Sequence, residues 1–128
     1  MKQFLLDTHV LLWMQDDSPY LSETVRDILT NPDNDLYVSI ASFWEIVIKR
    51  SLGKLELEYT IKDLVQSCAI NNIIILPVQF SFLEHLETLP FIHRDPFDRL
   101  IAATVIDLNY GLLSKDPNLH LYDLQVYW

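Results

Sequence analysis

Four short runs of consecutive apolar residues constrain the fold of this chain more than any other feature of its sequence. They occupy residues 4–6, 36–40, 73–78 and 112–113. Because the runs are continuous and do not alternate with polar residues, they are typical of strands that are covered on both faces. Such strands form parallel sheets with helices packed on either side. A final run, residues 124–128, could add an edge strand.

Segments with the periodicity of amphipathic helices separate these runs. Residues 25–29 carry an apolar stripe after Ser22, and residues 61–68 carry another after Thr60. Serine and threonine are strong helix N-caps, so we expect helices to begin at both points. The alternation of strands and helices predicts an α/β fold, a three-layer α/β/α sandwich around a mostly parallel central sheet. Two glycines lie where helices are expected to stop, Gly53 and Gly111, and Gly111 leads directly into the fourth predicted strand.

The composition is that of one globular domain. The chain has 128 residues, of which 50% are hydrophobic, and we expect a single domain over residues 1–128. The one cysteine, Cys68, has no partner for an internal disulfide and is expected in the core. The first residues carry one lysine and a short apolar run, far less than a signal peptide or a membrane span needs. We therefore expect a cytoplasmic protein with no membrane association.

The acidic balance limits the partners that the chain can have. A formal charge of −9 argues against nonspecific nucleic-acid binding, because lysine and arginine usually supply much of that affinity. Several acids that bind a divalent cation would reduce this barrier, because a phosphate can bridge to the cation. Some basic residues also lie near acids, either as ordinary surface pairs or as parts of a site: Lys49, Arg50 and Lys54 after Glu45, Arg94 and Arg99 around Asp98, and Lys115 before Asp116.

Two acids stand close to the ends of the first two predicted strands. Asp7 directly follows residues 4–6, and its carboxylate is either the N-cap of the next helix or a ligand that Thr8 could orient. Glu45 lies one turn into the next helix, among apolar residues that predict a largely buried helix. A buried carboxylate needs a partner or a metal. Lys49, at position i+4, is the alternative partner, although it leaves the apolar surroundings unexplained.

Three further aspartates accompany the later elements. Asp95 precedes Pro96, and proline favours the first helical position, so Asp95 is predicted as a helix N-cap. Asp98 then falls in the first turn, where it either complements the helix dipole or points toward the strand ends as a ligand. Asp116 lies beyond the fourth strand and could equally be a turn residue before Pro117.

Taken together, the four acids indicate a site. In a parallel sheet, ligands gather at the carboxyl ends of the strands, so Asp7, Glu45, Asp98 and Asp116 are expected to converge. Converging carboxylates repel one another unless cations or protons neutralise them. Mg²⁺ prefers oxygen ligands and keeps waters, one of which can be the nucleophile in phosphodiester hydrolysis. The sequence thus predicts these acids as metal ligands and catalytic residues.

Four segments of the chain resemble the successive motifs of the PIN-domain family: residues 6–13, 38–46, 93–103 and 113–116. Their order and spacing, together with the total length, resemble the VapC-type toxins of bacterial toxin–antitoxin pairs over essentially the whole chain. This resemblance implies an α/β/α sandwich with endoribonuclease activity. It also implies a homodimer that is silenced by a VapB-type antitoxin, whose tail occupies the active-site groove.

The same resemblance implies that Mg²⁺ or Mn²⁺ is held by acids at the matching positions of the motifs, with Ser114 supporting the fourth acid. Those positions are Asp7, Glu45, Asp98 and Asp116. The chain departs from the family at His9, where many relatives have Ser or Asn, and at Ser114, where Thr is more usual. Both departures bear on metal affinity.

Other functions fit the residues less well. A phosphorelay receiver domain needs an aspartate after its third strand, and this chain has none at residues 76–78. A haloacid-dehalogenase-type phosphatase needs a second aspartate where this chain has His9. A PIN-like binding or scaffold protein without activity is the remaining alternative, although such a protein usually lacks one of the acids. The other histidines do not form a zinc-like cluster and are expected at the surface or beside metal ligands: His85, His93 and His120.

Overall fold

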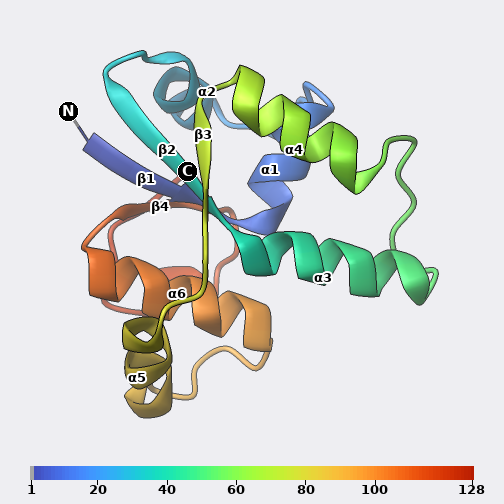
Figure 1. Ribbon diagram of the computed structural model, residues 1–128. Helices are drawn as coiled ribbons and strands as arrows, with labels where there is room; N and C mark the ends of the chain where they lie inside the picture. Colours follow the sequence, from blue (N-terminus) through green and yellow to red (C-terminus); the bar gives the residue numbers. More distant parts are fainter. Residues whose placement is uncertain (1) are drawn as a thin grey trace.

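The computed structural model describes residues 2–128, which form five strands, six α-helices and one short 3₁₀ helix (Figure 1). This is the α/β fold that the sequence predicts. Within residues 2–128, no helix has the length and hydropathy needed to cross a membrane. In chain order the elements are β1 (Lys2–Leu6), α1 (Thr8–Gln15), α2 (Glu23–Thr30), β2 (Asn34–Ser39), α3 (Ile40–Ser51), α4 (Ile61–Ile70), β3 (Ile73–Leu76), α5 (Phe80–Thr88), α6 (Pro96–Leu108), β4 (Gly111–Leu113), the 3₁₀ helix η1 (Leu119–Leu121) and β5 (Val126–Tyr127).

All the strands are parallel, in the order β3-β2-β1-β4-β5. The chain builds the sheet from β1 in one direction through β2 and β3, and then returns to the other side of β1 for β4 and β5. The strand order therefore reverses between β1 and β4, where Leu6 pairs with Leu113. In open parallel sheets, the crevice outside the carboxyl ends of the strands at such a reversal is where ligands bind. The predicted edge strand is confirmed as β5.

Alternate residues of the central strands face two separate cores. Phe4 and Leu6 point into a core shared with α1 to α4, whereas Leu5 points into a second core shared with α5 and α6. Helices consequently cover both faces of the sheet, with α5 and α6 on the opposite side from α1, α2 and α4 (Figure 1). This double covering explains why the strands have continuous apolar sequences. Cys68 is buried in the first core, as predicted.

The helices begin at the predicted caps, but one of them ends differently. Ser22 and Thr60 each accept a backbone hydrogen bond in the first turn that follows them. After α3, Gly53 adopts a positive φ of 69°, as expected for a helix end. After α6, the left-handed residue is Asn109, with φ 56°, because asparagine tolerates this conformation. Gly111 is already the first residue of β4, so its predicted role as a helix stop is wrong.

Helix α3 is less buried than its apolar sequence predicts. Phe43 and Ile46 pack into the core, but Trp44 is 63% exposed and Val47 is 44% exposed. The buried face of the helix is therefore narrow, and the prediction of a largely buried helix is wrong. Glu45 nevertheless lies on the buried face, with 2% of its surface exposed.

Close packing explains why residue 111 is a glycine. A Cβ atom at Gly111 would lie 2.8 Å from Phe4 Cδ1 and 2.9 Å from Tyr127 Cε2, which is too close for ordinary contact. The two rings pack edge to face, with centroids 5.4 Å apart, so neither can move without disturbing the other.

We predict that Gly111→Ala lowers the free energy of unfolding by about 1–3 kcal/mol, the usual effect of overpacking. Urea unfolding followed by circular dichroism would measure it. In a Phe4→Leu background the shorter side chain can rotate away, so the loss should be smaller. An equal loss in both backgrounds would contradict the steric explanation.

Candidate active site

Asp7 is fixed at the end of β1 by contacts with β4. As the N-cap of α1, it accepts a hydrogen bond from the Val10 amide (2.9 Å), and its other oxygen accepts one from the Ser114 hydroxyl (2.5 Å). Its own amide donates to the Leu113 carbonyl (3.1 Å). Burial raises the pKa of Asp7, although the hydrogen bonds from Ser114 and Val10 act in the opposite direction. The capping role is confirmed, and the same carboxyl lies at the strand tip.

Glu45 has a partner on each carboxylate oxygen. Oε1 accepts a hydrogen bond from the Thr8 hydroxyl (2.6 Å), and Oε2 lies 2.6 Å from Lys49 Nζ. Thr8 therefore orients Glu45, and the prediction that it orients Asp7 is wrong. Partial burial lowers the pKa of Lys49, but the hydrogen bond and charge of Glu45 outweigh it and raise the pKa. The alternative partner at i+4 is thus present, and it neutralises a buried carboxylate.

Asp98 and Asp116 meet at the ring of His93. Nε2 of His93 lies 3.1 Å from Asp98 Oδ2 and 2.8 Å from Asp116 Oδ2. The other ring nitrogen, Nδ1, accepts a hydrogen bond from the Asp95 amide (3.1 Å). Because an amide can only donate, Nδ1 carries no hydrogen, and the ring hydrogen is on Nε2, facing the two carboxylates. The backbone of His93 is held in turn by the Tyr122 hydroxyl, which accepts from its amide (2.9 Å).

Of the two aspartates at the start of α6, Asp95 is the helix cap and Asp98 is not. Asp95 is the N-cap, accepting hydrogen bonds from the amides of Phe97 (2.8 Å) and Asp98 (3.2 Å), as predicted. Asp98 follows in the first turn, with its side chain mostly buried. Burial, followed by repulsion from Asp95 and Glu45, raises the pKa of Asp98 to about 7.

Electrostatic effects join the predicted acids. Besides burial, the charge of Asp116 raises the pKa of both Asp7 and Asp98, and the charge of Glu45 raises that of Asp98. A hydrogen bond adds a direct link, because the Ser114 hydroxyl that donates to Asp7 also accepts from the Asp116 amide (3.0 Å). The acids therefore lie in one electrostatic neighbourhood, at the reversal between β1 and β4.

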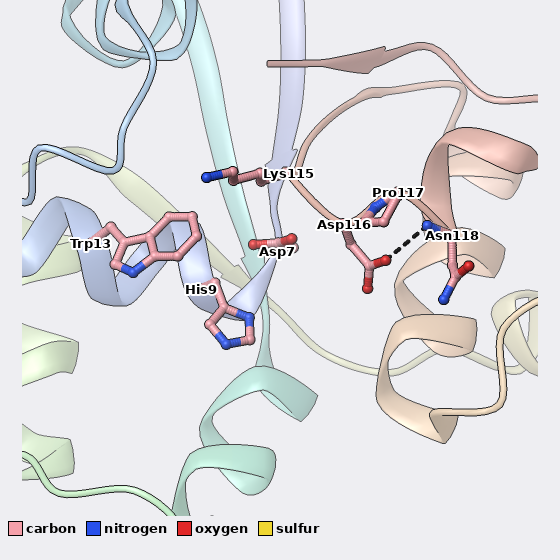
Figure 2. A pocket seen from close by; sticks show the side chains of 7 residues that line it. All are labelled: Asp7, His9, Trp13, Lys115, Asp116, Pro117 and Asn118. Carbon is pink, nitrogen blue, oxygen red and sulfur yellow. Dashed lines mark hydrogen bonds between the residues drawn. The ribbon is translucent and has the colours of Figure 1, made fainter.

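A pocket of about 480 Å³ opens beside two of these acids. Figure 2 shows Asp7 between the side chains of α1 and the loop that follows β4. The charge of Lys115 lies at the same opening. The pocket is lined by Asp7, His9, Trp13, Lys115, Asp116, Pro117 and Asn118.

Two carboxylates could hold a cation beside a histidine ring. Nε2 of His93 and one carboxylate oxygen each of Asp98 and Asp116 lie within 4.8 Å of one another. Because Nε2 carries the ring hydrogen, Asp98 and Asp116 would be the ligands and His93 would position them. His93 is the member that sequence reasoning placed least firmly, between the surface and a position beside metal ligands. The available signal was its place two residues before the cap of α6, which brings its ring back over the first turn. His85 instead pairs with Asp107 (3.2 Å).

The sequence of residues 4–124 matches the PIN domain. The chain belongs to this family. It is 28% identical over 122 residues to a protein named Ribonuclease VapC22 from Mycobacterium tuberculosis, an alignment that covers 93% of this chain and 91% of that relative. The chain is therefore related to VapC ribonucleases at low identity.

Solved structures confirm the PIN-like fold. VapBC-1 from nontypeable Haemophilus influenzae superposes with a TM-score of 0.63 at 18% identity, covering 98% of this chain and 96% of that one. FitAcB from Neisseria gonorrhoeae gives a TM-score of 0.62 at 19% identity, with 98% and 96% covered. A Klebsiella pneumoniae structure described as a toxin-antitoxin complex gives 0.62 at 16% identity, with 97% and 95% covered.

We predict that Asp98→Asn stabilises the metal-free protein more at pH 8 than at pH 5. The pKa of Asp98 is about 7 in the folded chain, whereas its ordinary value is 3.8. Between pH values of about 4 and 7 the folded state therefore binds more protons than the unfolded state. The free energy of unfolding consequently falls as pH rises from about 4 to 7. Asparagine does not titrate, so the free energy of unfolding of Asp98→Asn does not fall for this reason as pH rises.

Thermal unfolding of both proteins in EDTA at the two pH values would measure the effect. Asp95→Ala provides the structural comparison, because it removes the cap of α6 and should cost about 0.5–2 kcal/mol at pH 5. A difference in melting temperature between Asp98→Asn and the unmodified protein that is the same at both pH values would contradict the prediction.

Proposed function

We propose that the protein is a metal-dependent endoribonuclease that hydrolyses RNA phosphodiester bonds. Its metal-binding and catalytic residues would be Asp7, Glu45, Asp98 and Asp116. The observation that carries the proposal is the cluster of largely buried acids at the strand-order reversal of a PIN-domain chain. The relative named Ribonuclease VapC22 supports the same reaction.

The acids fit Mg²⁺ or Mn²⁺. The raised pKa values of Asp7 and Asp98 mean that the protein compensates their charged forms incompletely. A divalent cation would provide that compensation, and carboxylate oxygens are the ligands that these hard cations prefer. When bound, the ion supplies a Lewis acid that activates water and stabilises charge on the phosphate.

The protein's own groups hold these carboxylates in fixed positions before substrate arrives. Such preorganisation matters because outer partners orient metal ligands and tune their affinity. Lys115, at the mouth of the pocket, provides a positive charge for an RNA phosphate. The holding partners are Ser114 for Asp7, Thr8 and Lys49 for Glu45, and His93 for Asp98 and Asp116.

A binding or scaffold protein without activity is the second candidate. The ion pair between Glu45 and Lys49 favours it, because Glu45 is already neutralised without a cation. The two candidates differ in whether the metal-loaded protein cuts RNA.

We predict that cleavage of RNA requires Mg²⁺ or Mn²⁺ and that Asp7→Asn lowers the rate by about 100-fold or more, the effect of losing one electrostatic group in other active sites. Asparagine is also a good N-cap, so the fold should persist. Removing the charge relieves repulsion, so stability without metal should hold or rise. Cleavage of a labelled oligoribonucleotide and circular dichroism would measure both.

The matched control is Asp27→Asn, an exposed position on α2, which should cut RNA at the normal rate. Full activity in excess EDTA, or undiminished cleavage by folded Asp7→Asn, would refute the mechanism. A folded, metal-loaded protein that cuts no RNA would favour the scaffold alternative.

We further propose that the protein is the toxin of a cytoplasmic toxin–antitoxin pair, which forms a homodimer and is silenced by a VapB-type antitoxin. The similar structures named as toxin–antitoxin assemblies support this role. Exposed apolar surface supports protein partners. Exposed apolar residues lie on α3, at Ile40, Trp44 and Val47, and from β3 to α5, at Ile74, Val78, Phe80 and Leu83.

Expression of this protein in a bacterium should slow growth, whereas Asp7→Asn should not, because toxicity depends on RNA cleavage. Co-expression of a small DNA-binding protein encoded by the adjacent gene should restore growth and copurify with the chain. Growth curves and affinity purification would measure these outcomes. Equal growth with the active protein and with Asp7→Asn would count against a toxin.

A further inference from the structure

A cluster of rings lies beside the acidic pocket, and within residues 2–128 these rings make no hydrogen bond to the four carboxylates. It consists of His9, Trp13, Tyr20 and Trp128, and we call it the aromatic wall. Trp13 lies at its centre, with ring centroids 5.5 Å from His9 and 5.6 Å from both Tyr20 and Trp128. His9 and Trp13 project toward the pocket that contains Asp7 (Figure 2).

Core packing explains only part of this wall. Trp13 packs at the edge of the core and is held there by Trp128. Tyr20, however, is 63% exposed, and His9 is exposed as well. Lys115 Nζ lies over the Tyr20 ring, 5.7 Å from its centroid, and also lines the pocket. A positive charge thus lies between the exposed rings and the acids.

The acidic charge of the chain leaves base stacking on aromatic rings as a source of RNA affinity. With a net charge of −9, the chain cannot obtain much RNA affinity by neutralising phosphates. Stacking of bases on aromatic side chains contributes about 1–3 kcal/mol per base and does not depend on the protein's charge. The rings of the wall already touch, since aromatic pairs in contact have centroids about 4.5–7 Å apart, so a base must stack on an exposed face.

We propose that the aromatic wall binds an unpaired nucleobase of single-stranded RNA, next to the phosphate that lies at the acidic pocket. Tyr20 provides the main stacking face, Trp13 supports it, and Lys115 contacts the RNA backbone. Bases within a duplex are stacked on their neighbours and do not offer a free face, so duplex RNA is excluded. This inference rests on the proposed ribonuclease function and adds the side chains that would bind a base beside the acids.

The test measures steady-state cleavage of decauridylate with Mg²⁺ by the full chain. Tyr20→Ala should raise KM by about 5- to 150-fold, the equivalent of one stacked base. Tyr20→Phe keeps the ring face and should restore the normal KM. The matched control is Ile70→Ala, since Ile70 is 79% exposed at the end of α4, and it should leave KM unchanged.

A second arm locates the stacked base. An abasic ribose is placed at one position of the decamer at a time. At one of these positions it should raise the KM of the unmodified protein. At that position it should not raise the KM of Tyr20→Ala any further. Annealing the RNA to its complement should abolish cleavage. Equal KM values for Tyr20→Ala and the unmodified protein, or equal cleavage of single-stranded and duplex RNA, would overturn the inference while leaving the ribonuclease function intact.

If the unmodified protein does not cut decauridylate, the proposed function fails for this RNA, and the same comparisons are made by fluorescence anisotropy of the uncut RNA in Mg²⁺. Loss of binding in Tyr20→Ala and its recovery in Tyr20→Phe would still support the wall as a base-binding site. Normal RNA binding by Tyr20→Ala, accompanied by weaker binding of the antitoxin, would assign the wall to the protein partner and overturn the inference.

Discussion

The hydrogen bond from Ser114 to Asp7 is the contact on which the rest of the candidate site depends. It joins the tips of β1 and β4 at the point where the strand order reverses. The same hydroxyl accepts the Asp116 amide, so the loop after β4 is positioned relative to β1. Asp116 then reaches His93, and through it the first turn of α6. One buried hydroxyl consequently aligns acids that come from distant parts of the chain.

The basic residues near the site are largely engaged with other groups. Lys49 pairs with Glu45, and Arg99 stacks over the Phe91 ring at 4.5 Å and donates to backbone carbonyls. Among residues 2–128, the ion pairs of Asp98 are with His93 and include no lysine or arginine. The neutral form of His93 donates a hydrogen bond but brings no full charge. Protons or a bound cation must therefore compensate the remaining carboxylates. Burial, followed by the charges of Asp95 and Glu45, raises the pKa of Asp98 to about 7.

Local patterns made most of the fold predictable, because continuous apolar runs and helix caps depend on neighbouring residues. Two features were not visible in this way. Asn109 ends α6 because asparagine tolerates the left-handed conformation, whereas Gly111 is needed for close packing within the sheet. In the site, the positions of the acids after the predicted strands identified them as candidates. The contact between Thr8 and Glu45, however, joins residues that only the folded sheet brings together. The contact between His93 and Asp116, in the loop after β4, likewise depends on the fold.

The cap at Asp7 also positions the aromatic wall. Because Asp7 fixes the first turn of α1, it sets the helix phase, and His9 and Trp13, separated by four residues, lie on one face of that helix. Val10 and Leu11 are buried in the core. A change that shifts the cap would move the carboxylate and these rings together. Tyr20 lies outside α1, so its ring can be removed without displacing the cap, which makes base stacking separable from the chemistry of the acids.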